Sequence, residues 1–197
     1  MTQPEETGSI DAVVASAISR ARDLGAQASF EGTVTILFSD IEDSSSLYET
    51  LGDLRAHEVI RIHNEIFRQQ IAAHRGVEVK ALGDSFMIAF SSARRAALCA
   101  IAAQRLFAAY CESHPDLPIR VRMGLHVGEA INESSDYFGR AVILAARIAS
   151  LAKGGQILVS STFHDLTENA GDLRFSPTGE TQLKGLAGTH HLFEIAW

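Results

Sequence analysis

The sequence predicts an α+β fold, a ferredoxin-like βαββαβ core with an extra C-terminal helix and β-hairpin, preceded by a short N-terminal helix. Two observations predict this fold class. Runs of apolar and β-branched residues alternate with segments of helical periodicity, in the order strand, helix, two strands, helix, strand. Two β-rich runs also flank Leu82-Gly83-Asp84, a turn signal typical of a β-hairpin. We therefore expect a mostly antiparallel sheet with the first strand at its centre and helices on one face.

The chain divides into an N-terminal appendage, residues 1–31, which is a predicted helix and linker, and a body, residues 32–197. In the appendage, apolar residues recur at alternating spacings of four and three: Ile10, Val14, Ala17, Ala21 and Leu24. This spacing is typical of a two-stranded coiled coil, and equally of one amphipathic helix docked on the body. The small and polar residues from Gly25 to Gly32 are the predicted helix stop and linker.

The body begins with an apolar strand over residues 33–39. Asp53 is a suitable N-cap for the next helix, whose apolar face repeats at helical spacing until Gly76 ends it. Residues 77–90 form the predicted hairpin. The later elements are an Ala-rich helix over 93–111 with Ser91 or Ser92 as N-cap, a strand over 119–131, a helix over 138–152, a strand over 156–160 and a β-rich pair over 173–195.

Charge and composition exclude several classes of protein. The 197-residue chain is 46% hydrophobic, and its net charge of -7 gives no basic surface for nucleic acid or for an anionic membrane. No apolar run approaches the roughly 18 to 20 residues of a membrane span, and the polar N-terminus lacks a signal-peptide core. Cys99 and Cys111 lie about 18 Å apart on one predicted helix, too far for a disulfide. We therefore expect a cytoplasmic protein with no nucleic-acid partner and no membrane partner.

The first strand of the body ends on acidic residues. The stretch TVTILFSDIED, residues 33–43, stops being apolar at Asp40. In the predicted topology this strand end can approach the hairpin tip at Asp84, so that two carboxylates converge. Paired carboxylates, completed by water and substrate phosphates, commonly bind Mg²⁺, because this small hard cation prefers oxygen ligands. The alternative is that Asp40 caps the following helix and Asp84 only suits its turn.

Five motifs in order and register resemble the class III nucleotidyl cyclase catalytic domain over residues 32–195: FSDIEDSS at 38–45, VKALGDSFM at 79–87, VRMGLHVGEA at 121–130, DYFGRAVILAARI at 136–148 and TQLKGLAG at 181–188. The resemblance implies that Asp40, Asp84 and the carbonyl of Ile41 hold two divalent ions per site, Mg²⁺ or Mn²⁺. The implied reaction is attack of the ribose 3'-hydroxyl on the α-phosphorus of a nucleoside triphosphate, which expels pyrophosphate and closes a cyclic nucleotide.

The resemblance also assigns substrate contacts. Lys80 and Asp136 match the purine-selecting positions of the family. An ammonium complements the N1 acceptor of adenine and a carboxylate its exocyclic amine, whereas guanine reverses both, so this pair is expected to select ATP. Their plain alternatives are a solvated strand lysine and a loop aspartate. Arg147 matches the arginine that stabilises charge on the transferring phosphoryl group, and Lys184 the lysine that binds the distal phosphates.

One position departs from the family pattern. Many members have a substrate-contacting asparagine one helical turn before the matching arginine, where this sequence has Ile143. An isoleucine side chain cannot donate a hydrogen bond. Either another group, such as Arg140, replaces the contact, or catalysis is slow, or the domain binds nucleotide without useful turnover.

The spacing of Lys80 and Asp84 bears on assembly. Four residues of strand span about 13 Å, a long distance for one chain to read the base with Lys80 and hold metal with Asp84. The resemblance implies that the metal carboxylates of one protomer face the purine and phosphate residues of the other, so that a homodimer holds two composite sites. The expected function is an adenylyl cyclase that makes 3',5'-cyclic AMP and pyrophosphate from ATP. The alternatives are a nearly silent nucleotide-binding regulatory module and a guanylyl cyclase.

Overall fold

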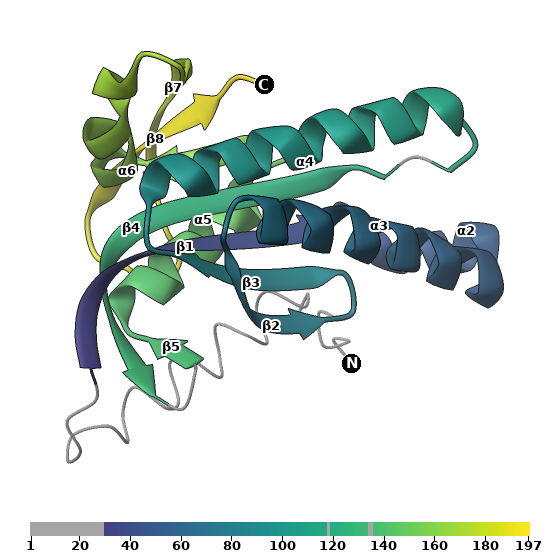
Figure 1. The fold of residues 1–197 in the computed structure, drawn as a ribbon, viewed down its shortest axis with the longest axis horizontal. Coiled ribbons are helices and arrows are strands. Elements are labelled where there is room, and N and C mark those ends of the chain that lie inside the picture. The colour runs from purple at the N-terminus through teal and green to yellow at the C-terminus, as the bar shows by residue number, and fades with distance from the viewer. Residues whose placement is uncertain (1–29, 118, 134–135) are drawn as a thin grey trace, which may run out of the picture.

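The computed structural model describes residues 30–117, 119–133 and 136–197. The two interpretations of residues 8–25, a coiled coil or a docked helix, fall outside this range. The elements follow in the order β1 (Phe30–Ile41), α2 (Ser44–Leu51), α3 (Asp53–Ala73), β2 (Val77–Leu82), β3 (Ser85–Phe90), α4 (Ala93–Ser113), β4 (Val121–Glu133), β5 (Asp136–Phe138), α5 (Arg140–Leu151), β6 (Ile157–Ser160), α6 (Ser161–Thr167), the 3₁₀ turn η1 (Glu168–Ala170), β7 (Phe175–Gln182) and β8 (Thr189–Ile195) (Figure 1).

Within the described residues, one sheet of eight strands organises the fold. Its strand order is β2-β3-β1-β4-β6-β8-β7, and β5 pairs with β4 beside this path. The β4–β6 pair is parallel and the other pairs are antiparallel. Because β1 lies between β3 and β4, the predicted central first strand is confirmed, as is the α+β class.

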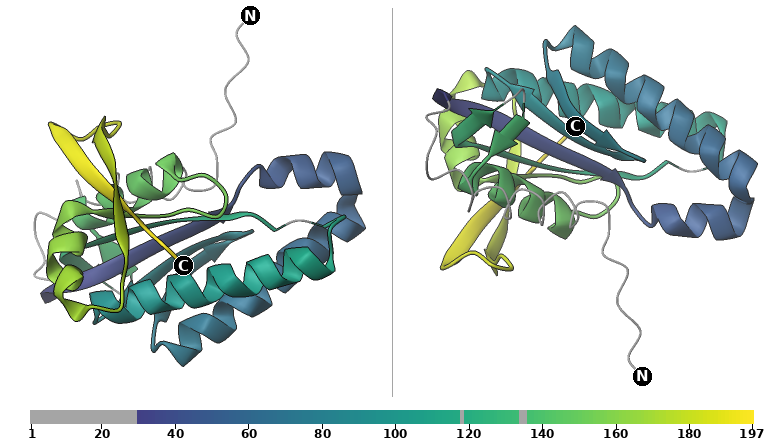
Figure 2. Two further views of the ribbon diagram at one scale, coloured as in Figure 1. Left: turned by 90° about the horizontal axis from the view of Figure 1, so that it is seen from above. Right: turned by 90° about the horizontal axis from the view of Figure 1, so that it is seen from below.

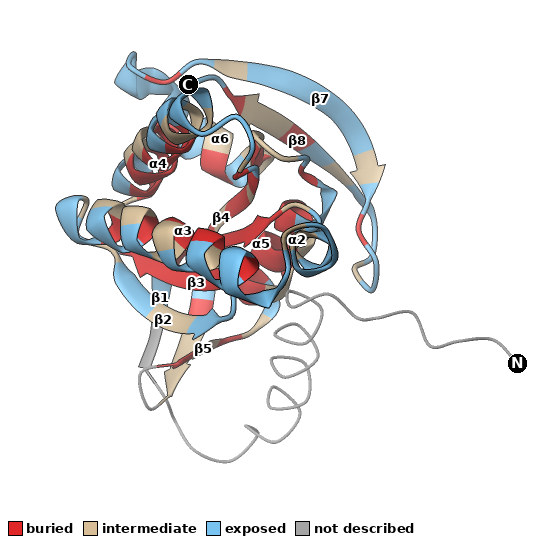
Figure 3. Cartoon of the chain, turned by 90° about the vertical axis from the view of Figure 1, so that its right-hand side faces the viewer, coloured by how far each residue is buried: buried red, intermediate tan, exposed pale blue. Residues whose placement is uncertain are grey.

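The helices cover both faces of the sheet, so the prediction of helices on one face is wrong (Figure 3). Along β1, Leu37 packs in a cluster with residues of α3 and α4, whereas its neighbours Ile36 and Phe38 pack in a cluster with residues of α5. Successive side chains of a strand point to opposite faces. Residues 34–41 of β1 are all buried, so this strand needs cover on both sides, and α5 supplies the second cover.

Small residues let α5 approach the sheet closely. A Cβ atom built on Gly124 of β4 would lie 2.1 Å from the backbone nitrogen of Ala149 in α5, so no side chain fits at this crossing. The face of α5 toward β1 and β4 is correspondingly rich in alanine: Ala141, Ala145, Ala146 and Ala149. This packing fixes the position of α5, which carries two of the predicted site residues.

Most predicted elements are present, with boundaries that differ by a few residues. Ser92 is the N-cap of α4, where its hydroxyl accepts a hydrogen bond from the backbone N–H of Arg95 at 3.4 Å. The short elements α2, β5, α6 and η1 were not predicted. Figure 2 shows α2 extending from the end of β1 toward the start of α3.

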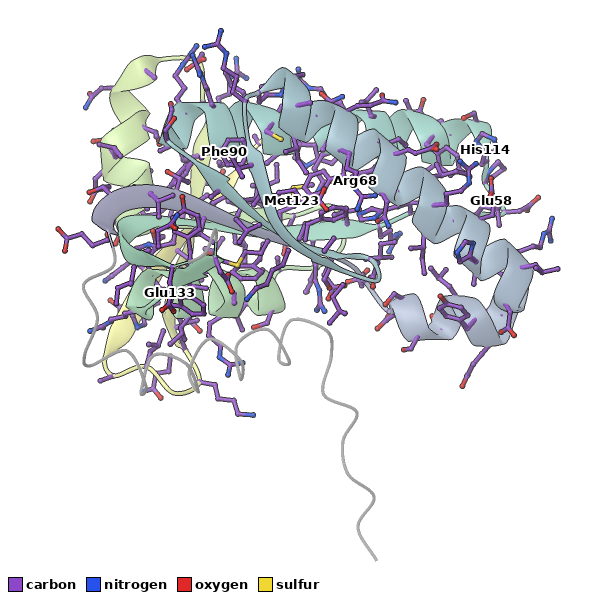
Figure 4. All side chains as sticks on the ribbon, turned by 60° about the horizontal axis from the view of Figure 1, so that its bottom comes forward. Glu58, Arg68, Phe90, His114, Met123 and Glu133 are labelled. Atoms are coloured by element: carbon purple, nitrogen blue, oxygen red, sulfur yellow. The ribbon has the colours of Figure 1, made fainter. Side chains whose placement is uncertain are left out.

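The main core lies between the sheet and the helices α3 and α4. It contains Phe90 of β3 and Met123 of β4 (Figure 4), together with the buried Cys99 of α4. Cys99 and Cys111 are both free thiols. None of the described helices is long and apolar enough to span a membrane.

Candidate active site

The structure brings the two predicted carboxylates together. Asp40 is the second-last residue of β1, and Asp84 lies in the turn between β2 and β3. Both residues are buried, with exposed fractions of 3% and 6%. The backbone N–H of Ile41 donates a hydrogen bond to Oδ2 of Asp84 at 3.0 Å, which ties the end of β1 to the hairpin tip. The alternative that Asp40 caps the following helix is wrong, because Asp43 is the N-cap of α2, and Asp84 does more than suit its turn.

The electrostatics of this pair favour a cation. Burial raises the pKa of the Asp40 carboxyl to about 6, and the neighbouring Asp84 carboxyl adds to the rise, while Arg122 opposes it. Nη2 of Arg122 donates to Oδ2 of Asp40 at 2.8 Å. The other oxygen of Asp40, Oδ1, is buried and has no hydrogen-bond partner within the part of the chain that the structure describes. A buried carboxylate oxygen without a hydrogen-bond partner is suited to coordinate a metal ion.

The residues fit a small hard cation. Carboxylate and carbonyl oxygens are the ligands that Mg²⁺ prefers, and Mg²⁺ usually keeps several waters and substrate phosphates rather than filling an all-protein cage. Across residues 30–117, 119–133 and 136–197, no group of three or more His, Cys, Asp or Glu side chains could hold a metal ion. Asp40 and Asp84 would therefore leave coordination positions for phosphate oxygens and water.

A polar contact from α3 supports the turn that carries Asp84. Gly83 adopts φ +63°, a left-handed conformation that favours glycine. Nδ2 of Asn64 donates to the carbonyl of Gly83 at 3.2 Å, and Oδ1 of Asn64 lies 2.9 Å from Nδ1 of His63. Burial lowers the pKa of His63 to about 4, so its ring is neutral at neutral pH, and it stacks on Phe107 with ring centroids 5.2 Å apart.

Sequence reasoning missed Arg122, Asn64 and a third contact, made by Glu42. Oε1 of Glu42 accepts a hydrogen bond from the backbone N–H of Gly154 at 2.9 Å, which ties the end of β1 to the loop after α5. Asp40 faces Arg122 because β1 and β4 pair in the register Asp40↔Arg122. The alternation along β4 indicated which face Arg122 occupies, but only the register identifies its partner.

The predicted purine residues also meet. Nζ of Lys80 in β2 lies 2.5 Å from Oδ2 of Asp136 in β5, and 5.5 Å from the ring centroid of Phe138. The side chain of Asp136 is 12% exposed and that of Lys80 30%. The pair is thus half-buried with a defined geometry, unlike a solvated lysine beside a loop aspartate.

The two predicted phosphate-binding residues line one cavity of about 250 Å³. Arg147 comes from α5 and is half-buried, and Lys184 comes from the connection between β7 and β8 and is exposed. Ile143, one helical turn before Arg147, packs partly buried against the cluster between α5 and β1. Arg140 lines a different cavity, with His126 and His190.

The metal and purine residues lie on the sheet face that carries α5. Met87 of β3 pairs with Phe38 on one side and with Lys80 on the other, and Asp40 follows Phe38 by two residues. Strands about 4.8 Å apart and a rise of about 3.3 Å per residue place the Cα atoms of Asp40 and Lys80 roughly 12 Å apart. Neither the 250 Å³ cavity nor a larger one of about 520 Å³ beside Thr33 is lined by Asp40, Asp84 or Lys80. Neither of these two cavities joins the metal carboxylates to Lys80 within one protomer.

Comparisons with known proteins identify the family of the chain. A family model described as the adenylate and guanylate cyclase catalytic domain matches residues 26–195. An adenylate cyclase of Podospora anserina is 35% identical over 162 residues, which cover 67% of this chain and 7% of that protein. An uncharacterized protein of Mycobacterium tuberculosis is 35% identical over 159 residues, or 79% of this chain and 53% of that protein.

Solved structures have the same fold. A structure of adenylate cyclases from Trypanosoma brucei in their monomeric state has a TM-score of 0.73 and 27% identity, and covers 83% of this chain and 87% of that chain. The chain spans about half of the M. tuberculosis relative and a small part of the fungal one.

Proposed function

This chain belongs to the adenylate and guanylate cyclase catalytic domain family, and we propose that it is an adenylyl cyclase that converts ATP to 3',5'-cyclic AMP and pyrophosphate. The observation that carries the proposal is that two buried carboxylates, those of Asp40 and Asp84, meet on the sheet face that also holds the Lys80–Asp136 pair. The adenylate cyclases among its relatives, at about 35% identity, support the same reaction.

Each residue has a role in the proposed reaction. Asp40, Asp84 and the carbonyl of Ile41 would hold two divalent ions, Mg²⁺ or Mn²⁺. When bound, such ions lower the pKa of the ribose hydroxyl and neutralise phosphate charge. Arg147 stabilises the charge that develops on the transferring phosphoryl group, and Lys184 binds the distal phosphates.

The purine half of the site selects the base. Lys80 donates to N1 of adenine and Asp136 accepts from its exocyclic amine. We propose that two copies of the chain form a homodimer, in which the metal carboxylates of one copy face the purine and phosphate residues of the other. The separation of roughly 12 Å between the Cα atoms of Asp40 and Lys80 in one protomer supports this arrangement, because a second copy can bring its own purine residues to the metal carboxylates.

A product assay tests the proposed function. The purified protein is incubated with ATP or GTP and either Mg²⁺ or Mn²⁺, and cyclic nucleotide is quantified. We expect cyclic AMP from ATP, with GTP a poor substrate. Faster formation of cyclic GMP from GTP would identify a guanylyl cyclase, and nucleotide binding without either product would identify the nearly silent regulatory module.

Removing both purine-selecting charges should erode the preference for ATP. In Lys80→Gln with Asp136→Asn, both hydrogen-bond complements to adenine are altered, while neither charge is left buried without its partner. Hydrogen bonds to charged groups are worth about 1.5 to 3 kcal/mol, so the ratio of kcat/KM for ATP to that for GTP should fall about tenfold or more. Steady-state kinetics with each nucleotide give this ratio.

A second ion pair that involves the same edge strand provides the matched control. Arg68 of α3 pairs with Glu78 of β2 at 2.8 Å, and neither residue is a proposed substrate contact. Arg68→Gln with Glu78→Gln should leave the ATP to GTP ratio unchanged. An unchanged ratio in the Lys80 and Asp136 variant as well would show that the base is read elsewhere.

Restoring an amide at position 143 should accelerate the reaction. Loss of one transition-state donor typically costs about 2.7 to 4 kcal/mol, so a chain without it is expected to be about a hundred- to a thousandfold slower than a fully equipped relative. Ile143→Asn should raise kcat with little change in KM, as for an interaction made only in the transition state. The position of Arg140 in another cavity favours this outcome over compensation by Arg140.

Two further variants complete this test. Ile143→Val keeps an apolar side chain and should give no gain in kcat. Arg140→Ala should leave kcat nearly unchanged. A lower kcat in Ile143→Asn, with a large loss in Arg140→Ala, would show that Arg140 already supplies the contact and that Ile143 shapes the ribose pocket.

A further inference from the structure

A cavity of about 350 Å³ lies against the first turn of α5, apart from the proposed catalytic groups. Residues of β4, α5, α6 and β8 line it, among them His126, Gly128, Arg140, Thr162 and His190. Neither Asp40, Asp84, Lys80 nor Arg147 belongs to its walls. The proposed reaction leaves its basic side chains without a role.

The ring of His126 presents a nitrogen to this cavity. Its Nδ1 lies 2.7 Å from the hydroxyl of Ser160, and that hydroxyl also accepts a hydrogen bond from the backbone N–H of Phe163 at 3.2 Å. The hydroxyl hydrogen is therefore available to Nδ1, which favours the tautomer that carries its proton on Nε2. A Cβ atom built on Gly128 would lie 3.0 Å from Nε2, so the missing side chain of Gly128 leaves this donor uncovered.

Two further basic side chains line the same cavity. His190 lines it from β8, although its Nε2 is buried and has no hydrogen-bond partner among the described residues. The guanidinium of Arg140 lines the cavity from α5, and the charges of His190 and Arg140 add to burial in lowering the pKa of His126 to about 4. Three basic side chains thus line one cavity, and the ring of His126 is neutral at neutral pH and can donate from Nε2.

One acidic residue also lines the cavity. Glu129 follows Gly128 on β4 and lines the cavity with it, so one carboxylate belongs to the same walls as the basic side chains. The side chain of Glu129 is exposed. The cavity thus has three basic side chains and one acidic one, and solvent screens the charge of the exposed carboxylate.

We propose that this cavity binds a small tetrahedral oxyanion, such as phosphate or sulfate, through Arg140 and the ring N–H of His126, with His190 in the same wall. The guanidinium supplies a fixed charge and a forked donor that suits two oxygens of such an anion. The hydroxyl of Thr162 offers a further donor on the α6 side. The cavity, with a volume of about 350 Å³, admits the anion together with water.

Inorganic phosphate tests the proposal by a readout that does not require cyclase activity. Phosphate is titrated into the full chain at constant ionic strength, held with sodium chloride, and the imidazole signals of His126 and His190 are followed by NMR. We expect saturable shifts of both signals, and the same with sulfate. Shifts that fail to saturate would show only a response to salt and would overturn the proposal.

Variants identify the site. Arg140→Gln should weaken phosphate binding about tenfold or more, because it loses a charge-assisted contact. Gly128→Ala places a methyl group against Nε2 of His126 and should also weaken binding, without changing any charge. If Gly128→Ala does not fold, Arg140→Gln decides alone. Arg105→Gln, on the exposed side of α4, removes the same charge elsewhere and should bind phosphate as the wild type does.

A variant of Lys184 distinguishes phosphate binding in this cavity from phosphate binding at the proposed catalytic site. In Lys184→Gln the shifts of His126 and His190 should persist with unchanged affinity, because Lys184 lines another cavity. Binding that survives in Arg140→Gln at full affinity, or that disappears in Lys184→Gln, would overturn the proposed site while leaving the cyclase assignment untouched.

Discussion

Asp40→Ala should reduce cyclic AMP formation to background. The substitution removes a buried carboxylate whose free oxygen is suited to a metal ligand. Bound divalent ions supply several kcal/mol of charge stabilisation in phosphoryl chemistry, and each 1.36 kcal/mol is a factor of ten, so we expect a loss of about a thousandfold or more in kcat/KM. Metal-dependent nucleotide binding, measured by calorimetry, should weaken as well.

The fold should survive this change. Burial and the nearby Asp84 raise the pKa of Asp40 to about 6, from an ordinary 3.8. An acid with a raised folded-state pKa destabilises the fold at pH values above its unfolded pKa, and most fully above its folded one. Removing Asp40 at pH 7 therefore relieves that cost, which offsets the loss of its contact with Arg122. Thermal unfolding should show a Tm close to that of the wild type.

Asp84 requires two variants, because it also accepts the hydrogen bond from the N–H of Ile41 at 3.0 Å. Asp84→Ala loses both the charge and this contact, whereas Asp84→Asn keeps an oxygen that can accept the bond. We expect both to be inactive, since the amide is a poor ligand for a hard cation. Activity in Asp84→Asn, with none in Asp84→Ala, would show that Asp84 acts only through its hydrogen bond.

A surface carboxylate provides the control for this series. Asp172 forms an exposed ion pair with Arg94, in the first turn of α4. Asp172→Ala should retain full activity, as expected for a surface ion pair of small energy. Full activity in Asp40→Ala would contradict the assignment of the metal site.

The sequence predicted the central strand, the hairpin and the meeting of Asp40 with Asp84, because these follow from element order and from one turn. A βαββ order places the first strand beside the hairpin, and Gly83 marks where the hairpin reverses. The meeting of Lys80 with Asp136 depended instead on resemblance, since β5 has three residues and no pattern of its own to reveal it.

Other features depend on register and packing, which periodicity does not encode. The contact of Arg122 with Asp40 follows from the β1–β4 register over the whole strand pair. The position of α5 on the second face follows from the fit of Gly124 against Ala149, two residues that lie far apart in the sequence. The support of the Asp84 turn by Asn64 likewise joins elements that the sequence pattern does not relate.

The composite site predicts recovery of activity from two inactive variants. Asp40→Ala lacks the metal half, and Lys80→Ala lacks the purine half but keeps both metal carboxylates. In a dimer with twofold symmetry the two interfaces are equivalent, so a mixed dimer has one site with both halves intact and one with both removed. Random exchange in an equal mixture makes about half of the dimers mixed, and each has one working site of two, which gives about a quarter of the wild-type rate.

Subunit exchange must be demonstrated for this experiment to be informative. Differently tagged copies of the two variants can be mixed and captured through one tag, and the second tag in the captured fraction then reports mixed dimers. A mixture of two batches of Asp40→Ala, treated in the same way, should remain inactive. This control excludes recovery by the handling itself.

Cyclic AMP formation by the exchanged mixture of Asp40→Ala and Lys80→Ala tests most directly whether the metal and purine residues are two halves of one adenylyl cyclase site. We predict that each variant alone is at background and that the mixture recovers about a quarter of the wild-type rate with ATP. Background activity in a mixture shown to contain mixed dimers would contradict the account, because the two halves would then have to act within one chain or not act together at all.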